Sequence, residues 1–133
     1  MTRPAHAGLR HLALNVRNLD AMKHFYVDLL GFAVEWEPDA ENIYLSSGLD
    51  NLALHVNPTR ISQEKRVDAL DHLGLIVRKP EDVDAWAAFL EGNGVAIDAK
   101  PRTHRDGARS CYFKDPDGNT IQIIHHPPIS DKA

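Results

Sequence analysis

Two stretches of the chain repeat one another, and this repeat limits the folds that the chain can adopt. Residues 10–17 read Arg-His-Leu-Ala-Leu-Asn-Val-Arg, and residues 71–78 read Asp-His-Leu-Gly-Leu-Ile-Val-Arg. His11 and His72 occupy the same place in the two copies, so the offset is 72 − 11 = 61 residues. Apolar residues of the next segment keep this offset: Met22 with Val83, Phe25 with Trp86, and Leu29 with Leu90. The repeat predicts a duplicated module.

The length and composition are those of one globular domain. The chain has 133 residues, of which 43% are hydrophobic and 26% charged. Two modules of about sixty residues would each be marginal alone, so we expect them to share a core or a sheet edge. No apolar run reaches the length of a transmembrane helix, and residues 1–8 lack the apolar stretch of a signal peptide. We therefore expect a cytoplasmic protein that does not bind membranes.

Charge and cysteine content exclude further classes of function. A net charge of −4 argues against nucleic acid as a partner. The single cysteine, Cys111, excludes an intramolecular disulfide and a thiolate metal site. The densest basic cluster is Arg102, Arg105 and Arg109. Its simplest interpretation is a solvated loop, and the alternative is contact with an anionic group of a substrate.

Hydrophobic periodicity predicts the same order of elements in both halves. Alternation of apolar and polar residues predicts strands, and apolar spacing of three and four predicts helices that end at Gly31 and at residues 92–94. The expected strands are 10–17, 32–37, 43–46 and 52–56, then 72–78, 95–100, 110–113 and 120–124, and the helices follow Asn18 and Pro80. This gives two β-α-β-β-β modules, at 9–57 and 70–127, joined by a linker at 58–69.

The paired modules and one further motif resemble a known superfamily. A histidine stands near the start of each module's first strand, and residues 113–122 read Phe-Lys-Asp-Pro-Asp-Gly-Asn-Thr-Ile-Gln. Over residues 9–127 the chain resembles the vicinal oxygen chelate superfamily, which includes glyoxalases, extradiol dioxygenases, fosfomycin-resistance transferases and bleomycin-binding proteins. The resemblance implies an α+β fold. Its two βαβββ modules would form a curved mixed sheet around a concave cavity, with the helices on the outer face and a divalent metal between the modules.

The resemblance also implies which residues bind the metal. The first-strand ligands would be His11 and His72, and the last-strand positions fall on His55 and Gln122. The apolar neighbours of His55 and Gln122 in their strands should face the helix-packed core, so these two side chains should face the other way. Imidazole suits zinc, nickel, cobalt and iron, and manganese also stays open as the ion.

Gln122 departs from the superfamily pattern, because many members have glutamate at this position. A glutamine amide can coordinate a metal through oxygen but cannot accept a proton. This argues against an extradiol dioxygenase, which needs two histidines and a carboxylate for iron. A glyoxalase-type reaction would need another base, for which His55, Glu35 and Glu37 are candidates.

The histidine-rich set favours a divalent-metal-dependent lyase or isomerase of glyoxalase type. Such an enzyme would act on a small oxygen-rich substrate by Lewis-acid stabilisation of an enediolate. The alternatives are a non-catalytic antibiotic-binding protein like the bleomycin-resistance proteins, and a metal-dependent dioxygenase or thiol transferase. Open sheet edges predict a homodimer. The ligands of one site could then come from one chain or from two.

Overall fold

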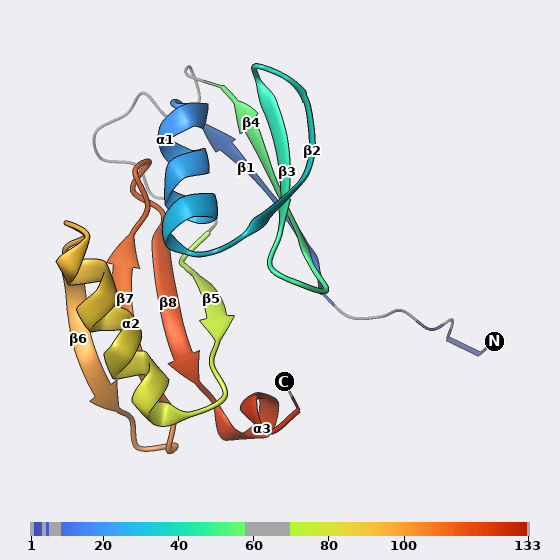
Figure 1. Ribbon diagram of the computed structural model, residues 1–133. Helices are drawn as coiled ribbons and strands as arrows, with labels where there is room; N and C mark the ends of the chain where they lie inside the picture. The colour runs from blue at the N-terminus through green and yellow to red at the C-terminus, as the bar shows by residue number, and fades with distance from the viewer. Residues whose placement is uncertain (1, 4, 6–8, 58–69, 133) are drawn as a thin grey trace. The chain divides into compact units, whose positions relative to one another are not determined.

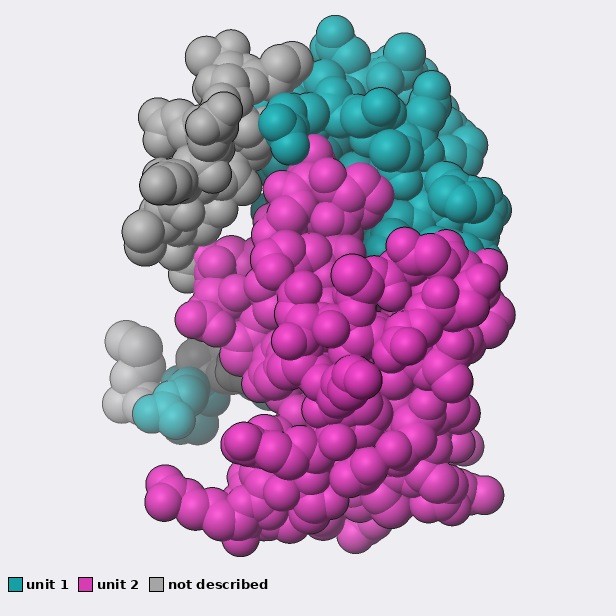
Figure 2. Space-filling model, turned by 90° about the vertical axis from the view of Figure 1, so that its left-hand side faces the viewer, with its two compact units in different colours: residues 1–64 teal, residues 65–133 magenta. Residues whose placement is uncertain are grey.

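The computed structural model describes residues 2, 3, 5, 9–57 and 70–132, and it divides the chain into two compact units. Unit 1 comprises Met1–Glu64 and unit 2 comprises Lys65–Ala133 (Figures 1 and 2). The predicted linker, 58–69, lies outside the described residues. Each unit is therefore described by itself.

Unit 1 contains one four-stranded sheet with its helical segment between the first two strands. Its elements are β1 (His11–Val16), α1 (Leu19–Lys23), η1 (His24–Leu29), β2 (Ala33–Asp39), β3 (Asn42–Ser46) and β4 (Asn51–Val56). The strand order is β1-β4-β3-β2, in which β1 runs parallel to β4 and the other neighbours are antiparallel (Figure 1).

The helical segment of unit 1 differs in one respect from the single α-helix expected. Asn18 caps it, because its side-chain oxygen accepts from the backbone N–H of Ala21 at 3.0 Å. The second half, η1, is a π-helix, in which the N–H of Leu30 reaches the carbonyl of Phe25 at 3.0 Å. Gly31, with φ +81°, ends the segment as predicted. Hydrophobic periodicity locates such a segment but does not distinguish an α-turn from a π-turn.

Unit 2 repeats this arrangement. Its elements are β5 (Leu73–Ile76), α2 (Pro80–Gly92), β6 (Ile97–Thr103), β7 (Arg109–Lys114), β8 (Thr120–His125) and a short α3 (Pro127–Ser130), which the sequence pattern did not predict. The strand order is β5-β8-β7-β6, again with a parallel first pair. Helix α2 lies along the sheet and buries Val83, Ala87 and Leu90 against β6, β7 and β8 (Figure 1).

A tight turn between β7 and β8 sets the position of the last strand. Asp115 is 4% exposed, and its carboxylate accepts from the backbone N–H groups of Asp117 and Asn119 at 2.9 Å each. Gly118 has φ +84°, a conformation that favours glycine. The turn returns the chain antiparallel, so that Gln122 of β8 pairs with Tyr112 of β7.

The predicted fold class, α+β with two βαβββ modules, is confirmed. The strands form two four-stranded mixed sheets, one in each unit. No helix in the part of the chain that the structure describes is long and apolar enough to cross a membrane.

Candidate metal and substrate site

In unit 1, alternation along the strands separates a helix-packed face from a polar face. Leu14 of β1 and Leu54 of β4 are buried in the core, at 9% and 0% exposure. His11 and His55 have the opposite parity in these strands, and their side chains contact polar residues on the other face. Both histidines therefore lie on the face of this sheet opposite the helix-packed core.

His11 is held by a chain of hydrogen bonds that ends at a carboxylate. The Asn51 Nδ2 group donates to Oε2 of Glu35 at 3.1 Å, and Oδ1 of Asn51 lies 2.8 Å from Nδ1 of His11. A carboxylate can only accept, so it fixes which end of the Asn51 amide is nitrogen. The amide oxygen must then accept from His11, which places a proton on Nδ1, so the neutral ring has its lone pair on Nε2.

His55 is held by a second chain of the same kind. Its Nδ1 lies 2.6 Å from Oδ1 of Asn42, and Nδ2 of Asn42 donates to both carboxylate oxygens of Asp39, at 2.9 and 3.1 Å. Hydrogen bonds from the Glu41 backbone and the Asn42 side chain hold the pKa of Asp39 below its ordinary value. The His55 ring also meets Tyr44 edge-on at 5.7 Å. The same reasoning leaves Nε2 of His55 as an acceptor.

The strand register separates the two histidines of unit 1. His11 pairs with Asn51, whereas His55 pairs with Asn15, four residues further along β1. Four residues of strand span about 13 Å, and each ring is fixed to its own asparagine. The structure therefore does not bring His11 and His55 together as ligands of one ion.

In unit 2, His72 and Gln122 lie against one tyrosine. The His72 ring meets the Tyr112 ring edge-on at 5.5 Å, and Nε2 of Gln122 donates to the Tyr112 hydroxyl at 2.8 Å. Nδ1 of His72 lies 2.6 Å from Oδ1 of Asp71, which can only accept, so Nδ1 carries a proton here too, and the neutral ring keeps its lone pair on Nε2. A Cβ at Gly74 would lie 3.5 Å from Oε1 of Gln122, so the amide oxygen lies over this glycine.

A comparison of the two registers corrects one expectation. His72 precedes Leu73, which pairs with Ile121, so Gln122 stands two residues beyond the position opposite His72. The equivalent residue in unit 1 stands two beyond Asn51 and is Ala53. The last-strand position of the first module therefore falls on Ala53 and not on His55, and a methyl group offers no ligand to a metal.

The donor set fits a divalent metal ion. Ligating histidines usually donate their other ring N–H to a carboxylate or carbonyl, which orients the ring and raises its basicity. His11 and His72 both meet this condition through Nδ1, as does His55. No group of three or more His, Cys, Asp or Glu side chains in the described ranges is arranged to hold an ion. The candidate ligands are two histidines and an amide, and they are divided between the units.

Two charged residues that the sequence placed near the site lie on the helix side of their sheets. Lys23 of α1 donates to both carboxylate oxygens of Glu37, at 3.2 and 3.0 Å. Arg109 forms a bidentate pair with Asp84 of α2, at 2.8 and 2.6 Å. This pair lowers the pKa of Asp84 and raises that of Arg109. Because both ion pairs lie on the helix-packed side, Glu37 is excluded as the candidate base and Arg109 does not belong to the predicted basic cluster.

A cavity of about 990 Å³ opens on the polar side of unit 2. Gln122 and Tyr112 line it from β8 and β7, and the β6–β7 loop supplies its basic residues. The complete lining is Arg102, Thr103, His104, Arg105, Asp106, Ala108, Tyr112, Gln122 and Ile124. Its volume suits a small molecule.

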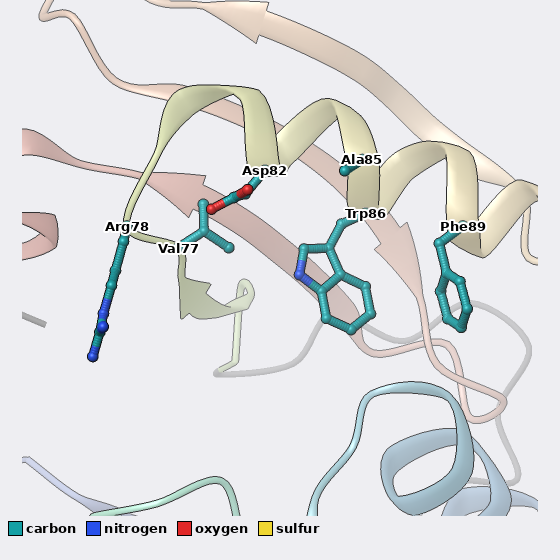
Figure 3. Close-up of a pocket in the computed structure, with 6 residues that line it drawn as sticks. All are labelled: Val77, Arg78, Asp82, Ala85, Trp86 and Phe89. Atoms are coloured by element: carbon teal, nitrogen blue, oxygen red, sulfur yellow. The ribbon is translucent and has the colours of Figure 1, made fainter.

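A second cavity, of about 430 Å³, lies beside α2 and is largely apolar. Figure 3 shows Trp86 and Phe89 projecting from the helix, with Val77 and Arg78 in the segment before it. The two aromatic rings meet edge-on at 5.6 Å. No residue with a metal-ligating imidazole lines it, so the candidate site is assigned to the polar faces.

The amides and the tyrosine that hold the site were missed by sequence reasoning. Asn51 and Asn42 contact His11 and His55 from neighbouring strands, 40 and 13 residues away in the sequence. Tyr112 of β7 meets His72, which precedes β5, across the intervening strand β8 and from 40 residues away. Only the register of the sheets reveals these partners. Among the hydrogen-bond partners given above for the three histidines, only Asp71 is adjacent to its histidine in the chain.

A family model described as the Glyoxalase/Bleomycin resistance protein/Dioxygenase superfamily matches residues 8–123. The chain belongs to this superfamily. It is 30% identical over 121 residues to a catechol-2,3-dioxygenase of Bacillus subtilis, which covers 88% of this chain but 41% of that protein. It is 26% identical over 126 residues to the metallothiol transferase FosB of Bacillus licheniformis, covering 94% of this chain and 79% of that protein.

Solved structures agree with this assignment at the level of the fold. A lactoylglutathione lyase from Agrobacterium tumefaciens superposes with a TM-score of 0.76 at 20% identity, covering 92% of this chain and 96% of that one. The named relatives and neighbours in this superfamily thus include a dioxygenase, a thiol transferase and a lyase. Superfamily membership identifies the fold and leaves the reaction to the residues of the site.

Proposed function

We propose that the chain is a metal-dependent enzyme, a lyase or isomerase of glyoxalase type, in which His11, His72 and Gln122 hold one divalent ion. The hydrogen bonding of the imidazole rings is the observation that supports this proposal most directly. His11 and His72 stand at equivalent places in the repeat, and each has Nδ1 bound to an acceptor and Nε2 available. Gln122 lines the cavity of unit 2, shares Tyr112 as a partner with His72, and would add an amide oxygen as the third donor.

A divalent ion at this position would polarise a substrate carbonyl and stabilise negative charge that develops on its oxygen. Gln122 is neutral and cannot remove a proton from the substrate. His55 has a free Nε2 acceptor, and the Asn42–Asp39 chain would stabilise its ring after it takes up a proton. However, the register places His55 four residues of strand, about 13 Å, from His11, so it does not reach a substrate on an ion held by His11 and we do not assign it proton transfer there. Glu35 reaches His11 only through Asn51, so it is a positioning residue and not the base.

Metal analysis tests the ligand set directly. Purified without chelator and supplied with zinc, nickel, cobalt, iron or manganese, the wild type should retain one ion per chain, and His72→Ala should retain none. Gln122→Glu should bind the ion more tightly, because a carboxylate adds a negative charge. His24→Ala is the matched control, since His24 pairs with Asp28 on the helical segment. A wild type that retains no metal after supplementation would refute the proposal.

Turnover tests the reaction class. A panel of hemithioacetals should be isomerised only by metal-loaded protein, and His72→Ala should abolish turnover together with the bound metal. If metal binds but no member of the panel is converted or bound, the glyoxalase-type reaction is wrong. If instead the protein binds a small molecule tightly without converting it, the function is sequestration, as in the bleomycin-resistance proteins.

A further inference from the structure

The cavity beside α2 belongs to a part of unit 2 that the proposed function does not use. Its lining comes from the segment before α2 and from one face of that helix, and its volume is about 430 Å³. Sites for small molecules occupy roughly 300–1,000 Å³, so this cavity is large enough for a small ligand. None of the three residues assigned to the metal, His11, His72 and Gln122, lines it.

The sequence repeat shows that the apolar character of this face is particular to unit 2. The offset pairs Ala85 with His24, since 85 − 24 = 61, and it pairs Phe89 with Asp28, since 89 − 28 = 61. In unit 1, Nδ1 of His24 lies 2.8 Å from Oδ2 of Asp28 on the exposed side of the helical segment. In unit 2, the same two positions carry a methyl group and a phenyl ring that is 47% exposed. The outer face of α2 therefore presents apolar surface where unit 1 presents polar groups.

Two aromatic rings form the apolar wall of the cavity. The half-buried indole of Trp86 meets the Phe89 ring edge-on, with 5.6 Å between the centroids. In Figure 3 the indole nitrogen of Trp86 lies on the side of the ring that faces Asp82. Among the described residues, none accepts a hydrogen bond from this N–H. An indole N–H can only donate, so it is available to an acceptor atom of a ligand.

The same cavity holds one positive and one negative side chain. Arg78 stands before α2, and Asp82 lies in the first turn of the helix. Figure 3 shows the Asp82 carboxylate between Arg78 and Trp86. Within the ranges that the structure describes, neither charge has an ion-pair partner, although Asp82 is half-buried. A ligand that satisfies both side chains must carry a negative and a positive group close together.

We propose that this cavity binds a free α-amino acid with an apolar side chain. The carboxylate of the ligand accepts from the guanidinium of Arg78 and from the indole N–H of Trp86, and its ammonium group donates to Asp82. The apolar side chain packs against the rings of Trp86 and Phe89. Charge-assisted hydrogen bonds of this kind are the strong ones, and the aromatic rings supply apolar contact area. This site lies outside the proposed metal site and does not rest on the proposed function.

Tryptophan fluorescence tests the site, because Trp36 and Trp86 are the two tryptophans of the chain. Trp36 is 59% exposed, so Trp36→Phe should leave the fold intact and make Trp86 the sole source of indole emission. Titration of this chelator-treated full-length variant with L-phenylalanine should give a saturable change in emission. Phenethylamine lacks the carboxylate and 3-phenylpropionate lacks the ammonium group. Each should have a dissociation constant about 10-fold higher, because each loses a hydrogen bond between charged groups.

Variants in the same background assign each charge to its partner. Arg78→Gln should weaken the binding of phenylalanine about 10-fold but leave phenethylamine unchanged, because phenethylamine has no carboxylate to lose a contact. Asp82→Asn should weaken phenylalanine to a similar extent but should not weaken 3-phenylpropionate. Arg105→Gln and Glu81→Gln are the matched controls, because they remove the same charges from exposed residues outside this cavity. Both controls should bind phenylalanine as the parent variant does.

Three results would exclude an amino-acid site beside α2. The first is no saturable change in Trp86 emission with phenylalanine. The second is binding of phenethylamine or 3-phenylpropionate as tightly as phenylalanine, since the cavity would then recognise the ring alone. The third is an equal loss of affinity in the control variants. Because the titrated protein holds no metal, failure of the metal site would leave these results unchanged.

Discussion

At the scale of single residues, two asparagine amides decide what the histidines of unit 1 can do. Each amide donates to a carboxylate and accepts from a ring nitrogen, Asn51 for His11 and Asn42 for His55. The carboxylate therefore fixes the orientation of the imidazole through two successive hydrogen bonds, although it does not contact the ring. Both rings consequently present Nε2 to the polar face of the sheet.

The two amides provide a matched pair of variants. Asn51→Leu removes the acceptor for Nδ1 of His11, so we expect the metal affinity to fall about 10- to 100-fold, the usual cost of losing such a partner. Asn42→Leu makes the same change at His55 and should leave the affinity unchanged. Competition with a chromophoric chelator measures both. If Asn42→Leu weakens metal binding and Asn51→Leu does not, the ion is held by His55 instead of His11.

Strand alternation predicted which face His11, His55 and Gln122 occupy, but it could not predict register. Ala53 and His55 have the same parity in β4, so a period of two cannot distinguish them as the counterpart of Gln122. The difference appears only when β4 is paired with β1. The same limitation hid Asn51 and Tyr112, which reach the histidines across strands.

At the scale of secondary-structure elements, helices α1 and α2 each form an ion pair with their own sheet on its helix-packed side. Lys23 of α1 pairs with Glu37 of β2, and Asp84 of α2 pairs with Arg109 of β7. Parity indicates this position for Arg109, because it shares a face with the buried Cys111. The prediction of one basic cluster at Arg102, Arg105 and Arg109 did not take this parity into account.

The pair between α2 and β7 should make stability depend on pH in the acid range. The hydrogen bond from Arg109 lowers the pKa of Asp84 below its ordinary value of 3.8, so the folded protein keeps this carboxylate charged to lower pH than the unfolded chain. The stabilisation is complete above pH 3.8 and is lost as the pH falls through the folded pKa.

Urea denaturation of the wild type and of Asp84→Asn measures this contribution. We expect a small difference in the free energy of unfolding at neutral pH, because both side chains are partly exposed. The difference should shrink as the pH falls below about 4. A difference that grows toward acid pH would contradict the assignment.

The outer strands of the two sheets are poorly suited to pair with another chain. Every residue of β2 is exposed, and the strand contains Pro38 and two register shifts. Strand β6 contains Pro101 and two register shifts of its own. Proline and irregular register are the usual features that protect sheet edges from association. Our expectation of a dimer therefore does not depend on β2 or β6.

At the scale of the whole molecule, we expect a homodimer. Light scattering coupled to size exclusion should give twice the 14.9 kDa mass of the chain. A mass of one chain at working concentration would contradict this prediction and would require all metal ligands to come from a single chain.

A mixture of His11→Ala and His72→Ala chains determines the source of the ligands. In a dimer whose sites each draw on both chains, a mixed dimer keeps one intact ligand set, so metal binding returns on mixing. If all ligands of a site come from one chain, the mixture of the two variants binds no metal. The repeat in the sequence predicts two equivalent histidines, but it does not predict whether the ligands of one site come from one chain or from two.

Ala53 of β4 is the residue of unit 1 that corresponds to Gln122 of unit 2. Ala53 stands where the second half of the repeat has Gln122, and its methyl group supplies no ligand at the position where Gln122 would supply one under the proposed function. Ala53 is 1% exposed, so a glutamate or histidine at this position would need space that neighbouring side chains now occupy. Under the proposed function, the packing around Ala53 thus sets the number of ligands, and with it the number of places left for substrate oxygen and water.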